Sequence, residues 1–152
     1  MDRAQKAVER IRERLGEKAI IETVEFRGEV TVVVAREALV DAAKLLKDDP
    51  ELEFDFLSDI CGVDWKGRAE RFDVVYHLYS IKYNARLRLK VRVSEGELSL
   101  PTVTGIWPTA GWHERETFDM FGIEFEGHQD LRRILNPEDF EGFPFRKDFP
   151  IN

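Results

Sequence analysis

A strict alternation of apolar and cationic residues constrains this chain more than any other feature. Between residues 85 and 93 every second residue is apolar, and those between are arginine or lysine: Leu87, Leu89, Val91 and Val93 against Arg86, Arg88, Lys90 and Arg92. Successive side chains of a β-strand point to opposite faces, so this pattern predicts a strand with one face in a core and the other in water. The chain is therefore expected to build a sheet that is covered on one face.

The segments before this strand indicate two helices and further strands. Apolar residues recur at helical spacing in 3–15, which ends at Gly16, and in 36–47, which stops before Pro50. β-rich runs fill four other segments, of which the first two form a hairpin: 19–26, 30–35, 54–63 and 72–81. We predict an α/β (α+β) fold, with a mostly antiparallel or mixed sheet, helices packed on one side and an extended C-terminal arm.

The composition changes in the last third of the chain. Residues 97–112 are rich in proline, glycine and tryptophan, which predicts a rigid loop with a short helical turn. A helix is expected over 110–121, and Gly122 supplies its stop. On this helix Arg115 and Asp119 are four residues apart, so we expect them to form an ion pair.

A short strand and a turn are predicted after that helix. Residues 123–126 alternate between apolar and acidic, and Asp130 is expected to cap a following turn. The chain is accordingly divided into an α+β domain at 1–135 and an extended Phe/Pro-rich arm at 136–152.

Length and charge exclude several classes of protein. A chain of 152 residues with 43% hydrophobic and 35% charged residues is expected to fold as one globular domain. The formal charge of -7 disfavours nucleic acid as a partner, because phosphate binding needs a basic face. The N-terminal residues lack the apolar stretch of a signal peptide, and apolar runs are short. We therefore expect a protein that stays where it is made and meets a membrane only indirectly.

Cys61 is the only cysteine, and it limits the cofactors that the chain can hold. One thiol excludes an internal disulfide, a thiolate zinc site and an iron–sulfur cluster held by this chain alone. Its strand-like apolar surroundings predict a buried structural thiol rather than a nucleophile. The sequence contains no GxGxxG motif and no P-loop, so a nucleotide site has no support either.

The histidines suggest two kinds of metal site, neither of which is well supported. His113 and Glu114 begin like the HExxH zinc-protease motif, but Thr117 stands where the second histidine is required. His77, His113 and His128 are far apart in sequence, and spacing alone does not exclude a three-histidine site. Ordinary polar roles explain each of them better, so no metal ligand is predicted.

The acidic residues of the same helix offer a catalytic alternative. Glu114, Glu116 and Asp119 could form a general acid–base set, but carboxylates at this spacing are common on solvated helix faces. The alternative function is a stand-alone hydrolase that uses Glu114, Glu116 and His128. No nucleophile or phosphate loop accompanies these residues, so no catalytic or cofactor-binding residue is predicted.

The segment 114–133 and the arm after it point to recognition. Exposed ion pairs contribute only about 0.2–1 kcal/mol each, so stability alone explains this density of charge poorly. We expect at least one of Arg115, Arg132 and Arg133 to be desolvated against an acid. The arm is too apolar for a free tail: Phe140, Phe143, Phe145 and Phe149 with Pro137, Pro144 and Pro150. It either folds back over its own domain or, as we favour, docks along a partner.

These residues resemble a known signature. The run ERETFDMFGI at 114–123, then DLRRIL at 130–135 and RKDFP at 146–150, closely resembles the C-type subunit, also called the 30 kDa-type subunit, of respiratory complex I, the proton-translocating NADH:quinone oxidoreductase. The matching positions define a candidate interface: Glu114, Arg115, Glu116, Asp119, Phe121, Gly122, His128, Asp130, Arg132, Arg133, Phe145, Arg146 and Asp148. Related subunits occur in membrane-bound nickel–iron hydrogenases and in ferredoxin- or deazaflavin-linked complexes, which stay open as alternatives.

The resemblance implies an assembly role. Such subunits hold no cofactor and pack beside the hydrogenase-like D-type subunit and an adjacent cluster-bearing subunit, while FMN and iron–sulfur clusters lie on partner subunits. It also implies a peripheral location on the cytoplasmic side of the cell membrane, as part of the complex. No catalytic site is expected on this chain alone.

Overall fold

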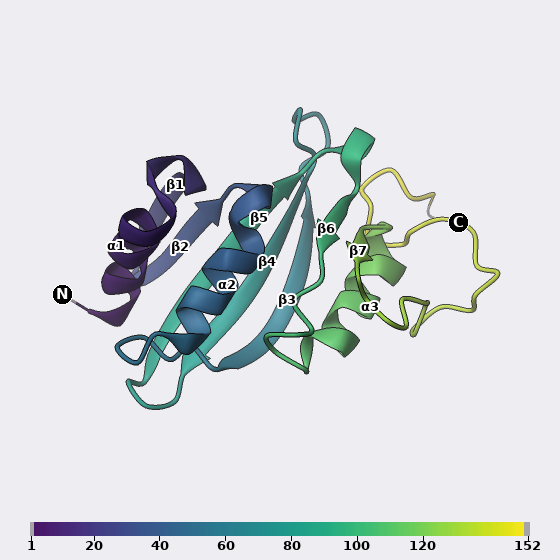
Figure 1. Ribbon diagram of the computed structural model, residues 1–152. Coiled ribbons are helices and arrows are strands. Elements are labelled where there is room, and N and C mark those ends of the chain that lie inside the picture. The colour runs from purple at the N-terminus through teal and green to yellow at the C-terminus, as the bar shows by residue number, and fades with distance from the viewer. Residues whose placement is uncertain (1, 151–152) are drawn as a thin grey trace.

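The computed structural model describes residues 2–150 and shows three helices beside two sheets (Figure 1). The last two residues of the predicted arm, 151 and 152, lie outside the described range. The elements in chain order are α1 Arg3–Leu15, β1 Ile20–Phe26, β2 Glu29–Val34, α2 Leu39–Asp48, β3 Phe56–Asp64, β4 Phe72–Ser80, β5 Ala85–Val93, β6 Ser99–Pro101, α3 Ala110–Phe121 and β7 Glu124–Glu126. No helix in this part of the chain combines the length and the apolar character that a membrane crossing needs.

The main sheet is mixed, and the strand from which the prediction started lies in its centre. The strand order is β1-β2-β5-β4-β3, with β2 and β5 parallel and all other pairs antiparallel. In β5 the apolar residues Leu87, Leu89, Val91 and Val93 are buried, and the cations between them are partly exposed. The predicted fold class is confirmed: a mixed sheet with helices on one side.

Local sequence signals define the first helix and the hairpin. The carboxylate of Asp2 accepts a hydrogen bond from the backbone N–H of Gln5 at 2.8 Å and caps α1, which ends at Gly16 with φ 91°. β1 and β2 pair as predicted. The second helix was predicted to begin at residue 36, but Arg36–Ala38 form a 3-10 turn and α2 begins at Leu39.

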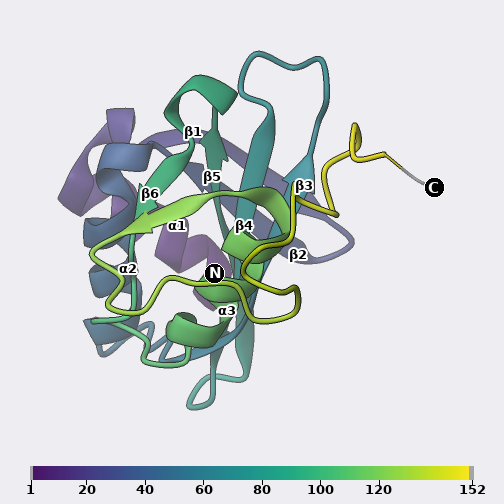
Figure 2. The ribbon, with the colours of Figure 1, turned by 90° about the vertical axis from the view of Figure 1, so that its right-hand side faces the viewer.

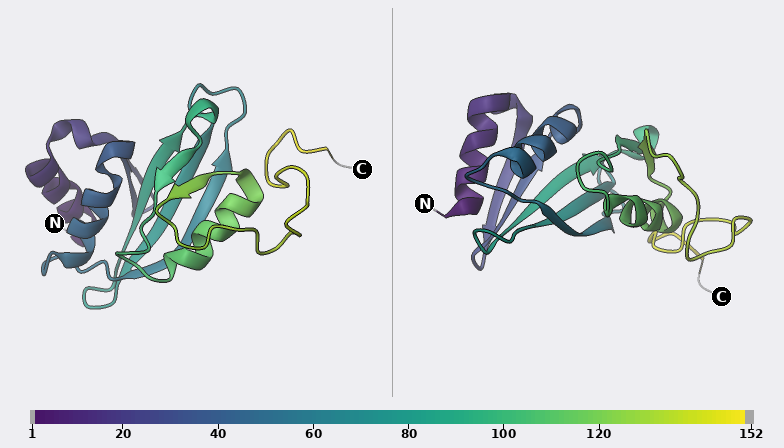
Figure 3. Two further views of the ribbon diagram at one scale, coloured as in Figure 1. Left: turned by 45° about the vertical axis from the view of Figure 1, so that its right-hand side comes forward. Right: turned by 60° about the horizontal axis from the view of Figure 1, so that its bottom comes forward.

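The helices and the second sheet share one hydrophobic core. α1 and α2 cover the sheet on the side of β2 and β5, and α3 continues this layer at the β3 edge (Figures 1 and 3). The fully buried Trp107 precedes α3, and its indole N–H donates to the carbonyl of Phe54 at 3.0 Å. α3 is therefore fixed to the sheet through the core.

Two predictions for the last third of the chain were wrong. Residues 99–101 were expected in a loop but form β6, which pairs in parallel with β7. The partner strand lies more than twenty residues later, so no local pattern reveals the pair. Asp130 caps no turn, because residues 131–136 have no regular structure, and their N–H groups bind a side chain of α3 instead.

Gly62 on β3 allows α3 to approach the sheet closely. A Cβ at this position would lie 2.6 Å from two ring carbons of Phe121, the last residue of α3. The Phe121 ring also packs edge-on against Phe72 of β4, with ring centroids 6.2 Å apart. The absent side chain of Gly62 is thus part of the contact between helix and sheet.

We expect Gly62→Ala to lower the free energy of unfolding by about 1–3 kcal/mol, because the added methyl group forces the Phe121 ring to move within a packed core. Urea denaturation of the purified chain measures this loss. Gly96→Ala is the matched control, since a Cβ at Gly96 meets nothing within 4 Å. Equal losses in the two variants would contradict the role given to this contact.

Candidate functional site

The helix α3 carries the signature acids, and they lie in different environments. Glu114 and Asp119 are fully buried, whereas Glu116 is only partly covered. The helix ends at Gly122, whose φ of 81° is a left-handed conformation that favours glycine. The expectation that these carboxylates share a solvated face is therefore wrong for Glu114 and Asp119.

Asp119 holds the chain that follows β7 against the end of α3. Its Oδ2 accepts the backbone N–H groups of Ile134, Leu135 and Asn136 at 3.2, 2.7 and 2.9 Å. Its Oδ1 accepts from the Asn136 side-chain amide and from Arg133 Nη1, both at 2.9 Å. Burial opposes its charge most strongly, but the bonds from Asn136, Leu135 and Arg133 together outweigh burial and lower the pKa of Asp119.

The arginine that pairs with Asp119 is not the one predicted. Arg115, four residues away on α3, donates instead to the carbonyls of Arg132 and Arg133 at 3.2 and 3.4 Å. Arg133 is the desolvated cation, with its side chain 9% exposed and a further bond to the Gly142 carbonyl at 2.7 Å. Arg132 is 58% exposed and pairs only with Asp130, at 3.0 Å. The tertiary contact thus prevails over the local i, i+4 pair.

Glu114 connects α3 to the loop after β6. Its oxygens accept from the hydroxyl of Thr102 and, at 2.9 Å, from the backbone N–H of Val103. Burial raises the pKa of Glu114, and these bonds together with the nearby His128 oppose that rise. His128 Nδ1 accepts from the backbone N–H of Asp130 at 3.0 Å, so its Nε2 carries the proton and donates to the Gly111 carbonyl at 2.9 Å.

Arg71, which no sequence pattern indicated, attaches the C-terminal arm to the sheet. Its guanidinium donates twice to Asp64, at 2.8 Å in both bonds, and once to Asp148 at 3.0 Å. These bonds raise the pKa of Arg71 and lower the pKa values of Asp64 and Asp148. Asp64 also accepts the backbone N–H of Lys147 at 2.8 Å. Asp64 and Arg71 lie seven residues apart at the ends of β3 and β4, but Asp148 joins them only through tertiary structure.

The aromatic part of the arm covers the end of α3. The Phe143 ring and the Arg146 guanidinium occupy the space that a side chain at Gly122 would fill. Arg146 Nε donates to the carbonyl of Phe121 at 2.8 Å, and the Phe145 N–H donates to that of Met120 at 3.0 Å. We favoured docking of the arm along a partner, but residues 143–148 fold back over their own domain.

A patch of exposed apolar side chains surrounds α3, and we call it the α3 patch. It consists of Trp112, Leu135 and Phe145, which are 53%, 58% and 61% exposed. Trp112 belongs to α3, and the backbone N–H groups of Leu135 and Phe145 are bound to Asp119 and Met120 near its end. Figure 2 shows α3 and the arm together on one side of the molecule. Exposed apolar groups that gather in this way mark an interaction surface.

The residues of the alternative hydrolase do not form a reactive set. Glu114 has no exposed surface and both its oxygens are bonded, so it cannot reach a substrate. Cys61 is half-buried rather than buried, and its thiol donates to Asp59 Oδ2 at 2.9 Å. Burial, followed by the nearby Asp59, raises the pKa of Cys61 to about 12, which disfavours a nucleophilic thiolate.

The mixed sheet, the buried signature acids and the α3 patch are those of a known family. Residues 32–152 match the family model of the respiratory-chain NADH dehydrogenase 30 kDa subunit, and the chain belongs to this family.

Individual relatives agree with this assignment. The C-type subunit of the NADH-quinone oxidoreductase of Roseiflexus sp. (strain RS-1) is 56% identical over 144 residues, which cover 95% of this chain and 82% of that protein. The C-type subunit numbered 2 of Rhizobium meliloti (strain 1021) is 57% identical over 124 residues, or 82% of this chain and 68% of that protein.

Two solved structures share the fold. The trypsin-resistant fragment (1-134) of Nqo5 superposes with a TM-score of 0.71 at 37% identity, covering 82% of this chain and 99% of that fragment. A chain of the membrane-bound sulfane sulfur reductase, an archaeal respiratory membrane complex, gives a TM-score of 0.80 at 26% identity, covering 99% of this chain and 87% of that chain.

We expect Arg133→Ala to lower the free energy of unfolding by about 3–5 kcal/mol, because it leaves the buried carboxylate of Asp119 without its charged partner. Arg132→Ala is the matched control and should cost at most about 1 kcal/mol, since its pair with Asp130 is exposed. Chemical denaturation of both variants decides between these outcomes. If Arg133→Ala unfolds like the parent, its charge is only part of a solvated face.

Proposed function

We propose that the chain acts as the C-type subunit of a proton-translocating NADH:quinone oxidoreductase, in the hydrophilic arm of complex I. In this role it supports electron transfer to quinone by holding the neighbouring hydrogenase-like D-type subunit beside the cluster-bearing subunit. The chain contributes structure, and the reacting groups lie on its partners.

The α3 patch is the observation that carries this proposal. Its three side chains are large and apolar, yet the backbone that supports them is fixed by buried hydrogen bonds to Asp119 and Met120. A partner therefore meets a surface that is already ordered, which lowers the entropy lost on binding. Beside it, Arg132 and Asp130 are exposed and can supply the polar rim of an interface.

The identities favour complex I over a hydrogenase-type complex. The chain shares 56% of its residues with a C-type subunit of an NADH-quinone oxidoreductase, but 26% with the sulfane sulfur reductase chain that has the same fold. The fold is common to both kinds of complex, so the sequence identity and not the fold supports the choice.

The location and the cofactors form part of the same proposal. We infer that the chain is peripheral, on the cytoplasmic side of the membrane, and reaches the bilayer only through the complex. Among the described residues, Cys61 is half-buried and protonated, so the chain offers no thiolate set for an iron–sulfur cluster. FMN and the iron–sulfur clusters are assigned to partner subunits.

The purified chain should be colourless, because neither flavin nor an iron–sulfur cluster is bound to it. A visible spectrum together with iron and flavin analysis measures this. Iron or flavin in stoichiometric amount would overturn the structural role.

Phe145→Ala should weaken capture of the D-type subunit by roughly tenfold or more while leaving the melting temperature close to that of the parent. The variant loses an exposed ring, but the backbone bond from residue 145 to Met120 stays. Phe26→Ala is the control, because Phe26 is also 61% exposed but lies on β1, at the other edge of the sheet.

Co-purification of each variant with the D-type subunit, alongside thermal melts of the lone chain, separates assembly from folding. Equal capture of Phe145→Ala and Phe26→Ala would show that the α3 patch is not the docking surface. A lower melting temperature for Phe145→Ala alone would assign Phe145 to the core of its own domain.

A further inference from the structure

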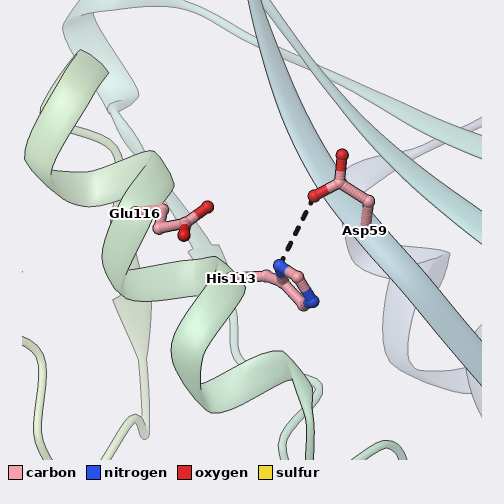
Figure 4. A group of neighbouring side chains, drawn as sticks. All are labelled: Asp59, His113 and Glu116. Carbon is pink, nitrogen blue, oxygen red and sulfur yellow. Dashed lines mark ion pairs between the residues drawn. The ribbon is translucent and has the colours of Figure 1, made fainter.

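Three side chains at the junction of β3 and α3 converge without a role in the assembly proposed above. Asp59 comes from the edge strand, and His113 and Glu116 come from the helix (Figure 4). One ligand atom from each lies within 4.8 Å of the other two. Nitrogen and carboxylate oxygen are the donors that borderline divalent metal ions such as Zn²⁺ accept.

Local geometry accounts for the convergence. His113 and Glu116 are three residues apart, so they share a face of α3. The register of β3 shifts between Leu57 and Asp59, and such a bulge redirects the side chain beside it. Figure 4 shows the Asp59 carboxylate pointing from the strand toward the imidazole. The group therefore bridges two elements that are far apart in sequence.

The contact between His113 and Asp59 is not explained as an ordinary hydrogen bond. His113 Nδ1 is shielded from solvent and has no hydrogen-bond partner, although Asp59 Oδ1 lies 3.4 Å away. A charged hydrogen bond between these groups would be about 2.7–2.9 Å long. Two ligands of one tetrahedral zinc ion, each about 2.0–2.1 Å from the metal, are separated by roughly 3.3 Å. The observed separation fits two ligands better than a donor and an acceptor.

Neighbouring donors orient both carboxylates. The Cys61 thiol donates to Asp59 Oδ2, which leaves Oδ1 directed at the imidazole. The indole N–H of Trp112 donates to Glu116 Oε1 at 2.5 Å and leaves Oε2 free. Hydrogen bonds of this kind, from residues that do not touch the metal, are typical of metal sites because they fix the ligand geometry.

We propose that Asp59, His113 and Glu116 bind one Zn²⁺ ion, or a divalent transition ion of similar preference, through one nitrogen and two oxygens, with water as the fourth ligand. The ion fastens α3 to the edge of the sheet. This revises the sequence-based expectation of no metal ligand, and it does not depend on membership of complex I.

The test uses the full-length chain after treatment with EDTA and removal of the chelator. Titration with ZnCl₂ in a calorimeter should give one site per chain, and the melting temperature should rise with zinc and fall again with EDTA. His113→Gln should weaken binding by roughly tenfold or more and abolish the rise in melting temperature. Asp59→Asn, on the other element, should weaken binding as well.

His77→Gln is a strict control, because His77 is the cross-strand partner of Asp59 but lies outside the group. It should bind zinc like the parent. Cobalt(II) gives an independent readout, since its visible bands report a tetrahedral site in the parent and should be lost in His113→Gln. Absent or multiple weak binding by the parent, binding retained by His113→Gln, or binding lost equally in His77→Gln would each overturn the assignment.

Discussion

The carboxylate of Asp119 is the interaction on which the α3 surface depends. It is fully buried, and a buried charge is tolerated only when it is paired and hydrogen-bonded. Three consecutive backbone N–H groups, one amide and one guanidinium meet that requirement. Because the donors belong to residues 133–136, satisfying the charge also fixes the path of the chain there. The positions of Leu135 and of the arm beyond it follow from this one acid.

Charge and apolar surface have separate tasks in this molecule. Much of the charge in the signature is used internally, since Glu114 binds the loop after β6 and Arg71 joins Asp64 to the arm. The α3 patch is apolar and lies on the framework that these bonds hold. A structural subunit benefits from this division, because burial of apolar side chains supplies affinity while internal ion pairs keep the surface in one shape.

The sequence predicted elements well where the signal is local. The alternation in β5 and the spacing in α1 follow from side-chain periodicity, and both elements agree with the prediction. It failed where a partner lies far along the chain. β6 pairs with β7 after an intervening helix, and Asp119 binds Arg133 rather than Arg115. Spacing on a helix ranks the nearby arginine first, but burial of Asp119 rewards the donors that also cover it.

The candidate site was only partly accessible for the same reason. The resemblance indicated the correct stretch of chain, but it did not distinguish buried Glu114 from partly covered Glu116, which periodicity places on the same short helix. The convergence of Asp59 with His113 depends on a bulge in β3, and no residue type announces that bulge. Whether the arm folds back was undecided because phenylalanine and proline suit both outcomes.

The bonds to Asp119 and Asp64 also determine which backbone amides exchange with solvent. The amides of Ile134, Leu135, Asn136 and Lys147 donate to these two carboxylates, although their segments have no regular secondary structure. Amide exchange requires the hydrogen bond to open, and each of these openings also exposes a charge or an aromatic ring. In deuterium exchange, these amides should therefore be protected like those of a helix, in contrast to the exposed residues 138 and 139 between them. Irregular structure and mobility are separate properties in this arm.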